Sequence, residues 1–120
     1  MGAFFVLYNL LYFLHLIMDL SVEIRLSMQR ALVCNLSPHV RGICCDWDDD
    51  KKWFKIIYYL DIEPNEDERE LQSIAMTEFH CDLQDFEKFD EECIYSEKSF
   101  ENLDRLRLVI LWRNEAPVFN

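Results

Sequence analysis

The sequence contains few of the residues that build sites for nucleotides or nucleic acids. Its 120 residues include only two glycines, too few for a glycine-rich phosphate-binding loop. Twelve Lys and Arg stand against 23 Asp and Glu, which gives a formal net charge of -11. Such a field repels phosphate backbones, and no local basic patch offsets it. The composition argues against nucleic-acid binding and favours a basic protein partner, unless the charge serves only to keep the chain soluble.

The sequence also lacks the cysteine pairs of a redox or zinc motif. Its five cysteines, at positions 34, 44, 45, 81 and 93, are odd in number and form no Cys-X-X-Cys pair. Reduced, buried thiols in the cytosol are therefore expected. His39 and His80 add no regular ligand spacing, and the neighbours Cys44 and Cys45 point to opposite faces of a strand. We expect no metal, no cofactor and no thiol chemistry.

Residues 1–18 contain no charged side chain unless His15 is protonated. The run is close to the lower limit of about 17 residues for a membrane-spanning helix, but it has no basic flank and no signal cleavage site. Three interpretations are open: a short membrane anchor, a helix packed on the domain, or sequence upstream of a true start at Met18. The last is favoured because the folded pattern begins directly after Met18. It predicts a cytoplasmic protein, with membrane association as the alternative if residues 1–18 are retained.

The length predicts a single domain over residues 19–115 with a loose tail at 116–120. Apolar residues spaced by three and four predict an amphipathic helix from Leu20 to Leu36. A second helix begins after Pro64 with Asn65 as its N-cap and Glu68 at the capping-box position. Its expected buried stripe consists of Leu71, Ile74, Ala75 and Phe79.

The stretch from Arg41 to Leu60 predicts a β-hairpin with a charged turn. A turn at Asp49 and Asp50, or a four-residue loop from Asp48 to Lys51, places Trp47 opposite Lys52. Because side chains alternate along a strand, one face becomes the core and the other is mixed. The core face collects Ile43, Cys45, Trp47, Phe54, Ile56, Tyr58 and Leu60, and the mixed face collects Cys44, Asp46, Trp53, Lys55, Ile57 and Tyr59.

Two further strands are predicted, at residues 88–97 and 105–113. In the last strand the core-facing residues are Leu106, Leu108, Ile110 and Trp112, and its arginines are expected to pair with glutamates of the strand before it. The order is then α-β-β-α-β-β, and it predicts an α+β two-layer sandwich. Two hairpins form a four-stranded, mainly antiparallel sheet, and two helices cover one face.

The most catalytic-looking stretch is Cys45 to Asp50, an apolar strand that runs into Asp-X-Asp-Asp. Aspartate-nucleophile phosphatases need Thr or Val where Asp50 stands, and an EF-hand loop needs Gly where Lys51 stands. A charged hairpin turn is the favoured interpretation. We therefore expect no enzyme and no catalytic residue, with a small Asp-dependent metalloenzyme as an alternative.

Several short motifs resemble a family of small bacterial immunity proteins of toxin systems, including those of contact-dependent growth inhibition and the colicin type. They are Ser27-Met28-Gln29-Arg30-Ala31-Leu32, Ser37-Pro38-His39-Val40-Arg41, Asp46-Trp47-Asp48-Asp49, the acidic start of the second helix, Thr77-Glu78 and Trp112-Arg113-Asn114-Glu115. The resemblance spans residues 19–115 and consists of fold and surface patterns. It implies a cytosolic, non-catalytic protein that sequesters a toxin domain made by the same lineage.

A basic toxin and an acidic inhibitor attract each other before contact, so acidic surface residues are the candidate binding residues. The candidates are Asp46, Asp48, Asp49 and Asp50 at the hairpin, Glu66, Asp67 and Glu70 at the second helix, and Trp53 and Tyr59 as aromatic anchors. A membrane-tethered adaptor is the alternative function. The oligomeric state is left open.

Overall fold

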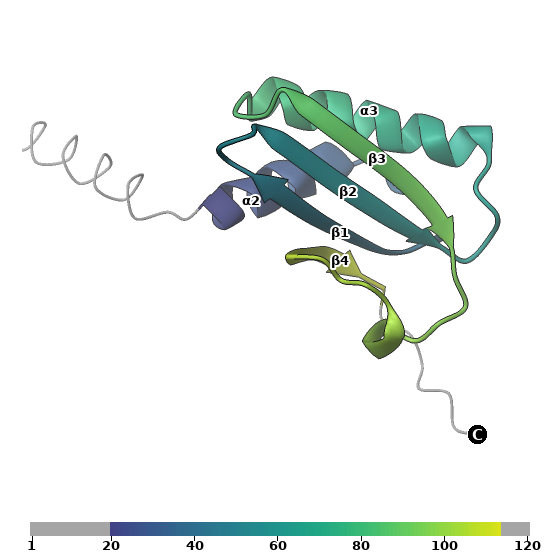
Figure 1. Ribbon diagram of the computed structural model, residues 1–120. Helices are drawn as coiled ribbons and strands as arrows, with labels where there is room; N and C mark the ends of the chain where they lie inside the picture. The colour runs from purple at the N-terminus through teal and green to yellow at the C-terminus, as the bar shows by residue number, and fades with distance from the viewer. Residues whose placement is uncertain (1–19, 114–120) are drawn as a thin grey trace, which may run out of the picture.

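The computed structural model describes residues 20–113, so the expectations for residues 1–18 and 116–120 lie outside the described residues (Figure 1). Its elements are α2 (Leu20–Leu32), β1 (Val40–Asp48), β2 (Trp53–Leu60), α3 (Glu66–Asp82), β3 (Lys88–Tyr95), the short 3-10 helix η1 (Phe100–Asn102) and β4 (Leu108–Trp112). The predicted α-β-β-α-β-β order is confirmed.

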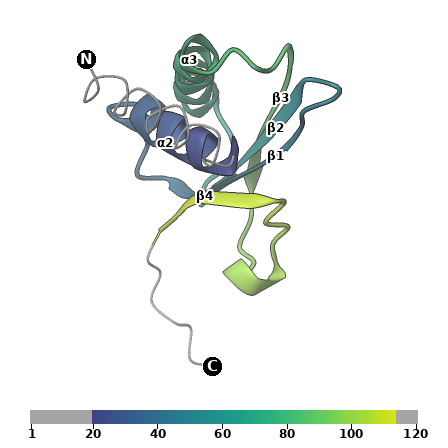
Figure 2. The ribbon, with the colours of Figure 1, turned by 90° about the vertical axis from the view of Figure 1, so that its left-hand side faces the viewer.

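The sheet is mixed, with the strand order β3-β2-β1-β4. β1 lies antiparallel to β2 and β4, whereas β2 and β3 are parallel because α3 returns the chain along the sheet. Both helices cover one face, which confirms the two-layer α+β sandwich (Figures 1 and 2). The prediction of a second hairpin is wrong, since β3 and β4 lie at opposite edges of the sheet. The expected ion pairs between their arginines and glutamates are wrong for the same reason.

The predicted core face of the hairpin is confirmed. All seven of its residues, Ile43, Cys45, Trp47, Phe54, Ile56, Tyr58 and Leu60, are at most 5% exposed. They pack against α2 residues such as Ile24 and Met28 and α3 residues such as Ala75 and Phe79. Burial of this continuous apolar surface is the main term that holds the two layers together.

The hairpin register differs from the prediction by two residues. Trp47 lies opposite Phe54 and not Lys52, because the loop consists of residues 49–52. Asp48 Oδ1 accepts hydrogen bonds from the Asp50 and Lys51 amides at 3.0 and 3.1 Å, and Lys52 has a φ of 53° that leads into β2. Since the shift is even, every side chain stays on its predicted face.

The helix α2 ends four residues earlier than predicted. Cys34 adopts a left-handed φ of 68°, and the Asn35 side-chain amide donates to the Ala31 carbonyl at 2.9 Å. This arrangement satisfies a terminal carbonyl and turns the chain before Pro38 is reached. Leu36, predicted within the apolar stripe, is 44% exposed.

The start of α3 is as predicted, but part of its buried face is not. Asn65 Oδ1 accepts from the Glu68 amide at 2.9 Å, which confirms the N-cap. Gln72 is buried, whereas Ile74 is 40% exposed and Leu71 is half-buried. The Gln72 side chain donates to the Glu92 carbonyl at 2.9 Å, so a polar contact helps to set the rotation of the helix.

A bulge in the pairing of β4 with β1 overturns half of the predicted core face of the last strand. Leu108 and Ile110 pack against the main core as predicted, whereas Leu106 and Trp112 do not. Ile43 pairs with Leu111 and Cys44 with Val109, which leaves Ile110 as an extra residue. Trp112 therefore lies on the face away from the helices. It joins a second, smaller core there with Cys44, Ile57, Tyr59, Leu103, Leu106 and Val109, so the helix-side placement of Leu106 is also wrong.

Trp112 lies directly over Gly42. A Cβ atom at position 42 would be 2.0 Å from Trp112 Cε3, so Gly42→Ala must displace the ring. We expect a loss of about 1–3 kcal/mol in the free energy of unfolding, the usual effect of overpacking, measured by urea denaturation. In a Trp112→Leu background the same change should be much less harmful. An equal loss in both backgrounds would contradict this contact.

Candidate partner-binding surfaces

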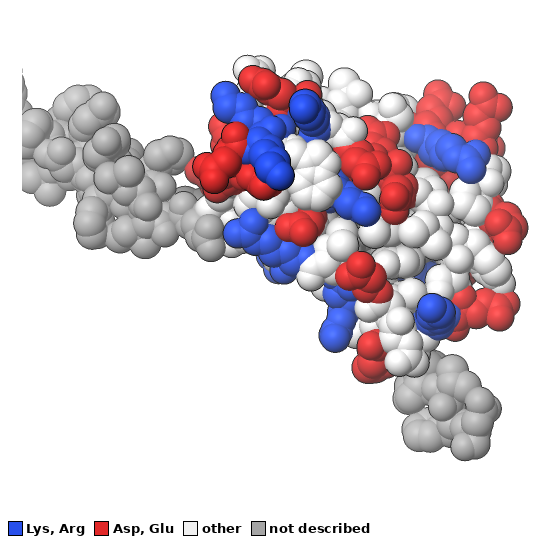
Figure 3. Space-filling view, viewed as in Figure 1, with Lys and Arg blue, Asp and Glu red and all other residues white. Residues whose placement is uncertain are grey.

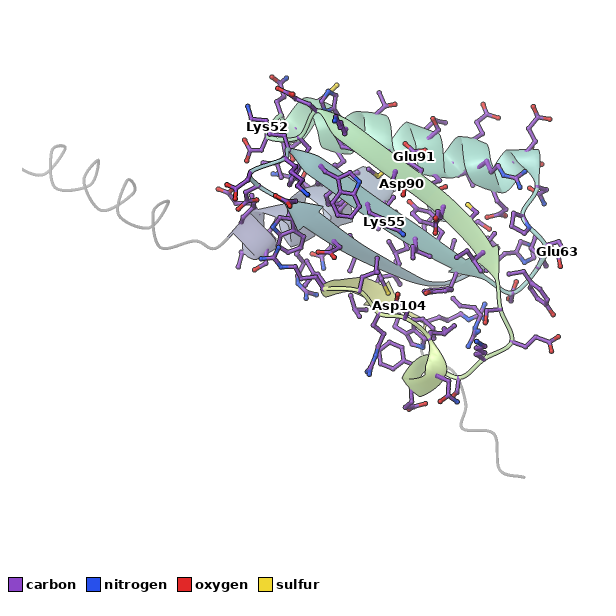
Figure 4. All side chains as sticks on the ribbon, viewed as in Figure 1. Lys52, Lys55, Glu63, Asp90, Glu91 and Asp104 are labelled. Carbon is purple, nitrogen blue, oxygen red and sulfur yellow. The ribbon has the colours of Figure 1, made fainter. Side chains whose placement is uncertain are left out.

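The face of the sheet away from the helices is only partly covered. The segment 96–107 and Trp112 cover its β1–β4 side together with Ile57 and Tyr59 of β2, whereas β3 and the hairpin end remain accessible (Figure 1). We call the accessible part the open face and define it by Asp46, Trp53, Lys55, Asp90 and Glu92. Figure 4 shows Lys55 and Asp90 on neighbouring strands of this face.

The open face places three carboxylates around one lysine. Lys55 is the cross-strand neighbour of Asp46, and its Nζ lies 3.8 Å from Glu92 Oε1. Figure 3 shows acidic side chains from the hairpin end to the far end of this view, with basic side chains among them. Beside these charges Trp53 is half-buried and offers an aromatic surface. The face thus combines an excess of negative charge with a candidate anchor residue.

The aspartates of the hairpin loop have different roles. Asp48 is half-buried and caps the turn, whereas Asp49 and Asp50 are exposed at its tip. The Nζ atom of Lys52, the last residue of the loop, lies 3.7 Å from Glu87 Oε1. Of the three loop aspartates, Asp49 and Asp50 can therefore contact a partner while the cap that Asp48 provides to the turn stays intact.

Tyr59 is part of the fold and not an accessible anchor. It is 4% exposed, its hydroxyl donates to the Asp104 carbonyl at 2.6 Å, and its ring packs edge-on against Trp112 with centroids 6.5 Å apart. The segment 96–107, which was predicted to contain the turn of a second hairpin, crosses the sheet and covers it. We leave Tyr59 out of the proposed contact set.

Glu66, Asp67 and Glu70 are exposed at the start of α3. The start of α3 follows the end of β2, whereas the hairpin loop precedes the start of β2, so the length of β2 separates the two acidic groups (Figure 1). The structure therefore does not bring them together. It adds Asp90 and Glu92, which were not among the predicted contact residues because the strand at 88–97 was predicted to pair with the last strand and not with β2.

Glu91 points to the helix side of β3, in alternation with Phe89 and Cys93, which pack against the main core. Burial raises the pKa of its carboxyl group. A carboxyl group whose pKa is higher in the folded state than in the unfolded chain stabilises the fold when it is protonated. This stability is complete below the unfolded pKa near 4.3 and is lost as the pH rises through the folded pKa. Glu91→Gln should therefore raise the melting temperature at pH 7 but not at pH 3.5. Glu91 is partly exposed to solvent, so the gain should be small. Glu101→Gln in η1 is the control, and an equal gain at both pH values would contradict the prediction.

The cysteines are only partly placed as expected. Cys44 and Cys45 are buried, whereas Cys34 and Cys81 are exposed, so the prediction of buried thiols is wrong for these two. Within residues 20–113, no three His, Cys, Asp or Glu side chains gather as ligands for an ion. Burial raises the pKa of Cys44 to about 11 and that of Cys45 to about 12, so both are protonated thiols at neutral pH. In the same range, no helix has the length and apolar content needed to cross a membrane.

The comparisons with known proteins agree with the predicted resemblance to toxin-immunity proteins. No curated protein matches the chain. The family model described as MafI2 immunity protein matches residues 21–115, a range that includes all four strands, α3 and nearly all of α2. The chain therefore belongs to the MafI2 immunity protein family.

Proposed function

We propose that this chain is a non-catalytic immunity protein of the bacterial cytoplasm that binds and blocks a basic toxin domain made by the same lineage. The family match over residues 21–115 carries the proposal, because an immunity protein acts by binding its toxin. The net charge of -11 supports a basic partner, since opposite charge speeds encounter and favours the correct pair.

The hairpin end of the open face is the proposed first contact. Asp46, Asp49 and Asp50 supply negative charge there, and Trp53 supplies a half-buried aromatic ring at the start of β2. Interface energy concentrates on aromatic residues that become fully buried, whereas exposed charges act mainly on the association rate. The acids at the start of α3 form a second, alternative contact region at the opposite end.

Capture and neutralisation together test this function. The full chain, immobilised as bait in extracts of its native cells, should retain one basic protein that elutes as salt rises, since salt screens surface charge. Producing that protein alone in a test bacterium should stop growth, and co-production of this chain should restore it. Retention of no basic protein at low salt, or growth arrest without rescue, would contradict the proposal.

A further inference from the structure

The outer edge of β3 carries backbone groups that find no hydrogen-bond partner in the part of the chain that the structure describes. β3 bonds to β2 through its even-numbered residues, since the Lys88 amide donates to the Lys52 carbonyl at 3.1 Å and the Ser96 amide to the Leu60 carbonyl at 3.2 Å. Alternation then turns the amides and carbonyls of the odd-numbered residues outward. These residues are Phe89, Glu91, Cys93 and Tyr95. Within residues 20–113, no hydrogen bond reaches their backbone groups.

This edge is regular enough to accept another strand. Its register with β2 runs unbroken from Trp53 opposite Lys88 to Leu60 opposite Tyr95, and it contains no proline. The views in Figures 1 and 2 place β3 at the rim of the sheet, with α3 on the helix face. The opposite edge is a poor template in comparison, because β4 has five residues and a bulge at Ile110.

The charge of β3 selects the kind of strand that can pair with it. Asp90 and Glu92 point to the open face and Glu91 to the helix side, so both sides of the edge are acidic. Acids at an edge discourage pairing with a second copy, because like charges would then lie side by side. An apolar strand would cover the same carboxylates while Lys55 alone balances the charge of Asp90 and Glu92. A strand with lysine or arginine side chains would pair with them.

We propose that β3 binds an extended, basic segment of the partner protein as a fifth strand of the sheet. The outward amides and carbonyls of β3 supply the main-chain bonds, and alternate basic side chains of the added strand lie beside Asp90 and Glu92. A basic side chain on the other side of the added strand lies beside Glu91, for which no ion-pair partner is found within residues 20–113. That this segment belongs to the toxin domain rests on the proposed function.

Amide hydrogen exchange of the ¹⁵N-labelled full chain tests the proposal with an eight-residue peptide of alternating lysine and valine. On saturation, exchange of the Glu91, Cys93 and Tyr95 amides should slow by at least about tenfold, while the Asp90 and Glu92 amides, already bonded to β2, should change little. A peptide of alternating glutamate and valine should have no effect. The proposal is overturned if the basic peptide does not bind at millimolar concentration, or if it binds without protecting the odd-numbered amides.

Two variants at the end of β3 separate backbone pairing from side-chain contact. Tyr95→Pro and Tyr95→Ala both remove the half-exposed ring, but only proline also removes an outward amide, and proline is tolerated at such edge positions. The proline variant should bind the basic peptide about two- to tenfold more weakly than the alanine variant, the effect of one hydrogen bond. Equal affinities in two folded variants would overturn strand addition.

This test is independent of toxin capture. If no toxin is captured but the odd-numbered amides become protected, the proposed function fails and the strand-binding edge stands. If a toxin is captured and the peptide leaves these amides unprotected, the partner docks elsewhere, with the hairpin end of the open face as the next candidate.

Discussion

Replacing Phe54 by alanine is expected to lower the free energy of unfolding by about 3–5 kcal/mol. Phe54 is fully buried, and its ring centroid lies 4.7 Å from that of Phe79, 5.2 Å from Phe86 and 6.2 Å from Phe89. One side chain thus joins β2 to α3, to the loop after α3 and to β3. Removal of the Phe54 ring leaves a cavity, because these four segments cannot all move inward to fill it.

Urea denaturation followed by far-UV circular dichroism measures this effect. Phe100→Ala is the matched control, because Phe100 is only half-buried and contacts Trp112 and Arg105 outside the main core. It should lower the free energy of unfolding by much less. Similar losses in the two variants would show that Phe54 is not the centre of the core. Because a domain is stable by only about 5–15 kcal/mol, Phe54→Ala should also lower the yield of folded protein.

The double variant Asp49→Lys/Asp50→Lys is expected to slow association with the captured toxin by one to two orders of magnitude at low salt. Both side chains are exposed at the tip of the hairpin loop, whereas Asp48, which caps the turn, is kept. The dissociation rate should change less, because exposed charges act mainly on encounter. Stopped-flow binding over a salt series provides both rates.

Glu63→Lys/Glu70→Lys is the matched control for this variant. It changes the net charge by the same amount with exposed residues near the start of α3, at the opposite end of the molecule (Figure 4 labels Glu63). If the hairpin end makes the first contact, the control should slow association by less than threefold, a minor effect beside the range known for electrostatic steering. A larger effect in the control would move the contact to the start of α3.

Much of the fold was predictable because its signals are local. The alternation of apolar and polar residues from Ile43 to Leu60 defines two faces, and an even shift in register leaves both faces unchanged. The Asn65 cap needs only the residues that follow it. The end of α2 was misplaced because the left-handed conformation of Cys34 is adopted by a residue that carries no turn signal.

The candidate surfaces were less predictable because they depend on contacts between distant segments. Asp49 and Asp50 are exposed as expected, but Tyr59 is buried because residues 96–107 cross the sheet above it. Glu66 and Asp67 lie far from the hairpin loop because α3 begins at the other end of β2. No periodicity in the sequence carries this information.

The sequence by itself determined the order of the elements, the two faces of the hairpin, the helix cap and the acidic surface, because each follows from residues close together in the chain. Only the tertiary structure decided that β3 adds in parallel beside β2 and that a bulge at Ile110 turns Trp112 onto Gly42. It also decided that, among residues 20–113, no strand pairs with the outer edge of the acidic strand β3. The physical reason is that strand order and register are set by the packing of the whole sheet and by loop closure, and the free energies of these depend on residues far apart in the sequence.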